Sequence, residues 1–205
     1  MPDIYVRQRE DILWLILNRH PHNLLTVSIL EQCVAVLQKT LRRSHSPRLL
    51  VITGTGEEAF CAGTEPETAS TQGQQMFAQS AQTLVTLLQQ VRAQKISTVA
   101  LVKGKALGAG CELAALCDTI IAREDALFRL PAPTEALFPH SIAVSFPAFM
   151  GKEATEQLVQ SGETLDAWKA MRLGLVQQVV PVRRFTQDIE ELLVLLASTT
   201  QSQSA

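Results

Sequence analysis

The segment from Val102 to Asp118 constrains the fold of this chain more than any other. An apolar run over 97–102 leads into small residues at 106–110, and a helical run with one acid, Glu112, follows. Small residues at a strand-to-helix junction let a ligand approach the backbone, and the first N–H groups of the helix lack partners within it. An anionic oxygen placed there meets these donors and the positive end of the helix dipole. The segment therefore predicts an oxyanion hole, with Glu112 as a candidate proton carrier.

A second segment has the same character. Residues 49–54 indicate a fully buried strand, and a glycine-containing stretch follows over 55–64. At this point the chain resembles the crotonase (enoyl-CoA hydratase/isomerase) superfamily. The matching motifs keep the family's order and spacing from about residue 4 to residue 181. They are Asn23-Leu-Leu, Ile52-Thr-Gly-x-Gly, Ala59-Phe-Cys-Ala-Gly-Thr64, Gly104-x-Ala-Leu-Gly-Ala-Gly-Cys-Glu-Leu-Ala114 with Cys117-Asp118, and Gly174-Leu-Val.

Composition excludes several other functions. The chain has 205 residues, which is room for one domain with a sizeable core, and a net charge of −2 gives no nucleic-acid-binding surface. The start Met1-Pro-Asp-Ile has no signal-peptide character, and no apolar run is long enough to cross a bilayer. The four cysteines lack metal-ligand spacing, so we expect reduced core thiols and no metal site. The sequence predicts a cytoplasmic protein with no membrane partner.

Strands and helices alternate along the chain, which favours parallel sheet layers with helices outside. The predicted strands are a hairpin over 4–7 and 12–17, followed by 49–54, 97–103, 119–122 and 175–180. The predicted helices cover 26–43, a segment containing Phe77 to Leu88, 108–117, 140–150, 152–160 and 184–196, with a frayed tail from residue 198. The resemblance sharpens this α/β class to the crotonase ββα superhelix, with a core domain over 1–181 and a C-terminal helix and flexible tail over 182–205. It also implies a homotrimer or a hexamer.

The resemblance implies a thioester substrate, carried by coenzyme A or by the phosphopantetheine of an acyl carrier protein, and no separate cofactor. Its carbonyl oxygen would be held by the backbone N–H groups of Thr64 and Ala109, which would stabilise an enolate. Losing one such donor typically costs about 3 kcal/mol. The residues expected to contact the substrate or coenzyme A are Asn23, Leu24, Ala62, Gly63, Gly108 and Gly110. An ordinary turn entering the first helix explains Asn23-Leu-Leu equally well.

The expected acids match the family only in part. Glu112 matches one of the two acids that hydratases use, although an acid in the first turn of a helix also favours the helix dipole. The second acid follows a Phe-x-x-Pro motif, and here Phe128-Arg-Leu-Pro131 is followed by Ala132. Glu135 could replace the missing acid only if the loop were remodelled, and we expect it to be an exposed loop carboxylate.

His140 is the main departure from the family pattern. The usual Pro-Gly-x-Gly-Gly-Thr segment is replaced by Pro139-His-Ser-Ile-Ala-Val-Ser145. His140 falls where some relatives place a catalytic aspartate, and an imidazole there could act as an acid or base near neutral pH. Alternatively, His140 caps the next helix or contacts solvent. The other histidines, His20, His22 and His45, lie in polar, turn-like stretches and are predicted to be surface residues.

Relatives in the family usually continue through several more helices, so the resemblance implies a truncated C-terminal helical region and a more open pocket. The predicted function is an acyl-CoA enzyme of the enoyl-CoA hydratase/isomerase type, with Glu112 as acid/base. One alternative is a dehydratase or decarboxylase acting on carrier-bound acyl groups in a polyketide-type pathway. The other is a non-catalytic protein that binds acyl-CoA or assembles with a partner.

Overall fold

The larger of two sheets has six strands. The computed structural model describes residues 2–43, 45–65, 71–138 and 140–199. The strands, in spatial order, are β1 (Ile4–Arg9), β2 (Ile12–Leu17), β3 (Leu49–Gly54), β5 (Ser97–Val102), β7 (Thr119–Arg123) and β10 (Gln178–Val180). Strands β1 and β2 form an antiparallel hairpin, and the remaining neighbours pair in parallel. The predicted hairpin and the parallel sheet are confirmed.

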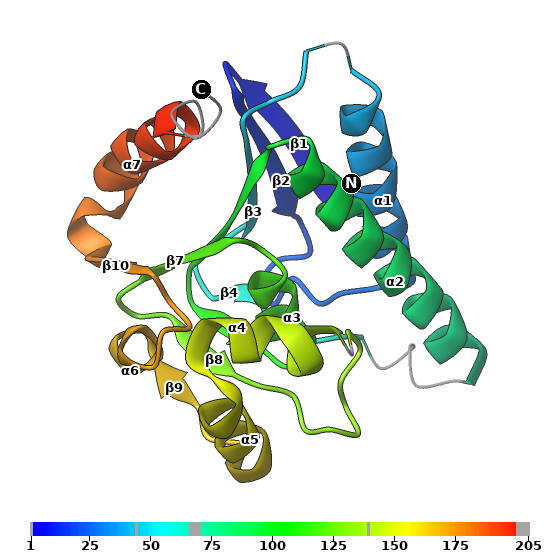
Figure 1. Ribbon diagram of the computed structural model, residues 1–205, viewed down its shortest axis with the longest axis vertical. Helices are drawn as coiled ribbons and strands as arrows, with labels where there is room; N and C mark the ends of the chain where they lie inside the picture. The colour runs from blue at the N-terminus through cyan, green and yellow to red at the C-terminus, as the bar shows by residue number, and fades with distance from the viewer. Residues whose placement is uncertain (1, 44, 66–70, 139, 200–205) are drawn as a thin grey trace.

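Helices cover both faces of this sheet. Helices α1 (Val27–Leu41) and α2 (Thr71–Ala93) lie on one side, and α7 (Phe185–Thr199) lies on the other (Figure 1). Leu50 and Ile52 of β3 belong to the main core beneath α1 and α2, whereas Leu49 and Val51 pack with α7. Because both faces are covered, the strand is buried along its whole length, and its residues are mostly apolar rather than alternating. This explains why residues 49–54 indicated a fully buried strand.

The second sheet was not predicted from the sequence. It contains β4 (Ala59–Cys61), β6 (Lys105–Leu107), β8 (Leu127–Arg129) and β9 (Leu165–Asp166), in that order. Each strand has three residues or fewer, which is too short for an apolar period to be read. The parallel pairing of β4 with β6 brings the 59–64 motif beside helix α3 (Ala109–Ala115), so the two glycine-containing segments meet.

The remaining helices are short. They are α4 (Phe146–Met150), α5 (Lys152–Ser161) and α6 (Ala167–Arg172), together with a π-helical turn η2 (Ser141–Ser145) and a 3₁₀ turn η3 (Val182–Arg184). The single helix predicted over 140–150 is thus a π-helical turn followed by α4, and α6 was not predicted. Pro139 and residues 200–205 of the predicted tail lie outside the described residues. Within the described ranges, none of the helices combines the length and apolar character that a membrane span requires.

Candidate active site

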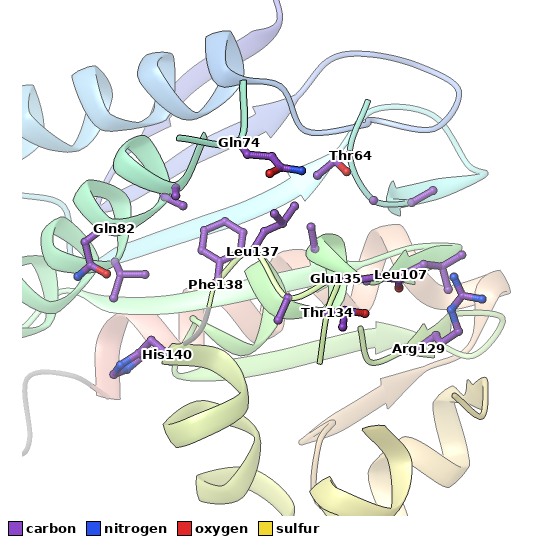
Figure 2. Close-up of a pocket in the computed structure, with 18 residues that line it drawn as sticks. Thr64, Gln74, Gln82, Leu107, Arg129, Thr134, Glu135, Leu137, Phe138 and His140 are labelled. Carbon is purple, nitrogen blue, oxygen red and sulfur yellow. The ribbon is translucent and has the colours of Figure 1, made fainter. Parts of the chain in front are cut away.

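A pocket of about 660 Å³ lies between α2, the start of α3, and residues 134–138 and 140. The predicted site residues that line it are Ala62, Gly63, Thr64, Gly108, Ala109 and His140. Figure 2 shows Thr64 on one side of this pocket, with His140 and Gln82 together at one end and Arg129 at the other. The structure therefore brings both predicted oxyanion residues and His140 to one cavity.

The two predicted oxyanion residues share a local geometry. Each follows a glycine with positive φ, which is 125° at Gly63 and 52° at Gly108. Thr64 is held by a bridge to Leu25, whose N–H donates to the Gly63 carbonyl at 2.9 Å. Ala109 is the first residue of α3, where backbone donors lack partners within the helix. Across the described part of the chain, neither the Thr64 N–H nor the Ala109 N–H has a hydrogen-bond partner.

Glu112 is buried and does not line the pocket. Its side chain is fully inaccessible to solvent, as its apolar neighbours in the sequence indicated. Its carboxyl oxygens accept hydrogen bonds from the N–H groups of Leu137 and Phe138, each at 3.1 Å. The Ser141 hydroxyl donates to Oε1 at 2.7 Å. Burial raises the pKa of Glu112, and these three hydrogen bonds oppose the rise.

We expect the raised pKa of Glu112 to make stability depend on pH. The folded chain holds the Glu112 proton more tightly than the unfolded chain does. The resulting contribution to the free energy of unfolding is fully present below the ordinary pKa of 4.5. It is lost as the pH rises through the raised folded pKa. Urea unfolding at a series of pH values will measure this, with Glu112→Gln as the non-titrating control. If the free energy of unfolding changes with pH in the same way for both proteins above pH 4.5, the raised pKa of Glu112 is contradicted.

Three other predicted contact residues are not part of the pocket lining. Asn23 is fully buried, and its side-chain amide donates to the carbonyls of Thr55 at 2.9 Å and Ala59 at 2.8 Å. Leu24 is half-buried beside it. Gly110 lies in α3 against β4, where a Cβ would sit 2.0 Å from the carbonyl oxygen of Cys61. Asn23 and Gly110 therefore contact the backbone near β4 and do not contribute to the pocket surface.

Asn23→Ala is expected to destabilise the fold by about 3 kcal/mol, because a buried carbonyl and a partly buried carbonyl lose their donor. Asn23 also has a φ of 49°, a conformation that alanine adopts less readily than asparagine. Urea unfolding will give the loss of stability, and acyl-CoA affinity measured well below the unfolding transition should change less than twofold. A specific loss of affinity in a stably folded variant would instead support the predicted contact with coenzyme A.

The structure also brings residues into the pocket that sequence reasoning did not place there. Glu135 follows a turn in which its N–H donates to the Ala132 carbonyl at 2.9 Å, and its exposed side chain lines the pocket. Arg129 lines it at the end of β8, and Gln74 and Gln82 line it from α2 (Figure 2). No sequence signal marked Arg129 or the glutamines, because their role depends on how β8 and α2 lie beside α3.

The remaining histidines and the cysteines behave as predicted. His20, His22 and His45 are exposed. The cysteines are free and buried, and burial raises the pKa of Cys33 and Cys61 to about 12. Within the described ranges, no cluster of three or more His, Cys, Asp or Glu side chains forms a metal-binding group.

The fold and the pocket place this protein in the class of crotonase-type α/β proteins. As in that class, two sheets are surrounded by helices, and the first residue of α3 lines the main pocket. The model of the enoyl-CoA hydratase/isomerase family matches residues 7–205. The chain therefore belongs to the enoyl-CoA hydratase/isomerase family, which is a family of lyase and isomerase enzymes.

Curated relatives and solved structures agree with this assignment. The 2,3-dehydroadipyl-CoA hydratase of Escherichia coli is 33% identical over 88% of this chain and 70% of its own length. The carnitinyl-CoA dehydratase of Proteus mirabilis is 26% identical over 96% of this chain and 75% of its own length. The crystal structure of an enoyl-CoA hydratase from Bacillus anthracis matches with a TM-score of 0.79 and 28% identity, covering 98% of this chain and 77% of that one.

The chain is shorter than these relatives. It spans 65% of the mitochondrial enoyl-CoA hydratase domain-containing protein 3 of Rattus norvegicus, to which it is 27% identical. The matched part contains the pocket and the residues that line it.

Proposed function

We propose that this protein acts on an acyl-CoA thioester, holding the thioester carbonyl at the N–H groups of Thr64 and Ala109 while an enolate forms. The observation that carries the proposal is that these two N–H groups have no hydrogen-bond partner among the described residues. Both belong to residues that line the same pocket. Backbone donors fixed before the reaction stabilise developing negative charge without reorganisation. The family assignment supplies the thioester as the substrate class.

In this proposal, the proton is transferred by titratable side chains that line the pocket. His140 is half-buried in the pocket lining, and Glu135 lines the same cavity. A titratable side chain must come within hydrogen-bond reach of the proton it transfers, directly or through one water. His140 and Glu135 can approach a bound ligand, whereas the carboxyl group of Glu112 is enclosed by its three donors. A direct acid–base role for Glu112 stays a prediction.

The first test is hydration of crotonyl-CoA, followed by the loss of enoyl-thioester absorbance. We expect turnover in the wild-type protein and a 100-fold or larger loss in His140→Ala, since general acid–base catalysis contributes about 10²- to 10⁴-fold. Glu135→Gln, assayed in parallel, shows whether the loop carboxylate takes part.

Two outcomes would change the proposal. Crotonyl-CoA that binds without reacting would redirect the search to isomerisation, decarboxylation or carrier-bound substrates. Failure to bind any acyl-CoA would favour a non-catalytic member of the family.

A further inference from the structure

The backbone that carries the Thr64 N–H lies against the turn over 19–25. The two segments form a parallel bridge between Leu25 and Thr64. Leu25 donates its N–H to the Gly63 carbonyl at 2.9 Å, and its carbonyl accepts from the Glu65 N–H at 3.1 Å. In a parallel pair, the residue opposite one that bonds in this way directs its own N–H to the other side. The Thr64 N–H therefore points away from Leu25, and Thr64 lines the pocket (Figure 2).

The turn over 19–25 is itself held by a buried side chain. Asn23 is fully buried, and its amide donates to the carbonyls of Thr55 and Ala59. The Asn23 N–H donates to the Arg19 carbonyl at 2.8 Å, and Asn23 Oδ1 accepts from the Arg19 N–H at 3.0 Å. Both backbone polar groups of Arg19 are thus bonded to a buried residue. The backbone from which the Arg19 side chain extends is therefore fixed.

An ion pair joins this turn to the residue that follows Thr64. Arg19 Nη2 donates to Glu65 Oε1, and the two side chains are 35% and 19% exposed. Because both side chains are half-buried, solvent screens this pair less than a fully exposed one. Arg19 also lies near Asp3, with 4.0 Å between Nη1 and Oδ1. The ion pair between Arg19 and Glu65 therefore acts one residue away from the proposed oxyanion donor.

We propose that Arg19 and Glu65 are a positioning pair that holds the Thr64 N–H in place as an oxyanion donor. The bridge to Leu25 sets the direction of this N–H, and the ion pair keeps the backbone at Glu65 against the turn. Neither Arg19 nor Glu65 belongs to the described lining of the pocket, so both act through the backbone. The inference rests on the proposed function, because the position of the Thr64 N–H affects the reaction only if a thioester carbonyl binds there.

The kinetic test compares Arg19→Ala, Glu65→Ala and the double variant, with Arg48→Ala as the matched control. Arg48 forms another partly exposed ion pair, with 3.2 Å between its Nε and Asp11 Oδ2, and it is not part of the described pocket lining. We expect each single variant of the positioning pair to lose about tenfold in kcat for crotonyl-CoA while KM changes less than twofold. The reason is that oxyanion contacts strengthen in the transition state. Arg48→Ala should keep wild-type kinetics.

The double variant decides whether the two side chains act together. It should lose no more kcat than either single variant, because the effects of two residues that act through one contact do not add. A loss of about 100-fold in the double variant would overturn the proposal, since the two side chains would then act independently. A rise in KM in Arg19→Ala that Glu65→Ala does not share would also overturn it, in favour of direct contact between Arg19 and the substrate. Wild-type kcat in both single variants would do the same.

Amide hydrogen exchange separates the positioning pair from the proposed function. If the wild-type protein binds and turns over no acyl-CoA, the proposed function fails, but the pair still predicts how the Glu65 N–H exchanges. Its protection factor should fall about tenfold in Arg19→Ala and stay unchanged in Arg48→Ala, because the ion pair opposes local opening of the bond to the Leu25 carbonyl. Unchanged protection of the Glu65 N–H in Arg19→Ala would overturn the positioning pair, whatever the kinetics show.

Discussion

Gly108→Ala is expected to lose about 100-fold in thioester turnover while remaining folded. Gly108 has φ 52° and ψ −120°, a conformation that L-residues rarely adopt, at a cost of about 1–3 kcal/mol. A Cβ at this position would meet no atom within 4 Å, so the penalty comes from the backbone and not from a clash. Relaxing it rotates the peptide between Gly108 and Ala109, which turns the Ala109 N–H away from its position. Loss of one oxyanion donor typically costs about 10²- to 10³-fold in kcat.

Gly162→Ala is the matched control for this prediction. Gly162 follows α5 with a φ of 62°, and a Cβ there also meets nothing within 4 Å. The variant is expected to lose about 1 kcal/mol of stability and no turnover. Steady-state kinetics and urea unfolding on both variants separate the two effects. Equal turnover in the two variants would contradict the role given to the Ala109 N–H.

Gly110→Ala is expected to prevent folding or to destabilise the protein by about 3 kcal/mol or more. The added Cβ would lie 2.0 Å from the carbonyl oxygen and 2.7 Å from the carbonyl carbon of Cys61. Overpacking in a core usually costs about 1–3 kcal/mol, and here the obstructing atoms are backbone that cannot rotate away. Relief requires α3 and β4 to separate, which would also move Ala109 away from Thr64.

The double variant Gly110→Ala/Cys61→Ala tests the cause. The two nearest obstructing atoms are backbone atoms, and the third is Cys61 Cβ, which alanine keeps, so Cys61→Ala should restore little stability. Soluble yield and urea unfolding will measure both variants. Wild-type stability in Gly110→Ala would show that α3 and β4 are not in this contact, and full rescue by Cys61→Ala would place the obstruction in the side chain.

The six-stranded sheet was predictable because its signals are local and long enough. Strands β3, β5 and β7 are mostly apolar runs of five or six residues that are buried along almost their whole length. The second sheet was not predictable, because strands of two or three residues carry no period and exist only through their pairing. The pocket lining divides in the same way: Thr64 and Ala109 were predicted from the family motifs that the chain resembles, whereas Arg129 and Gln82 had no local signal.

Glu112 shows most clearly what sequence and tertiary structure each determine. The apolar neighbours of Glu112 indicated by themselves that this acid is buried, and the motifs around it identified the family. Its partners, however, are Leu137, Phe138 and Ser141, which lie 25 to 29 positions further along the chain. Burial follows from local residue pattern, because an apolar helix face must pack against something. The direction in which a buried carboxyl group points depends on which donors the rest of the chain brings to it, and only the tertiary structure decides that.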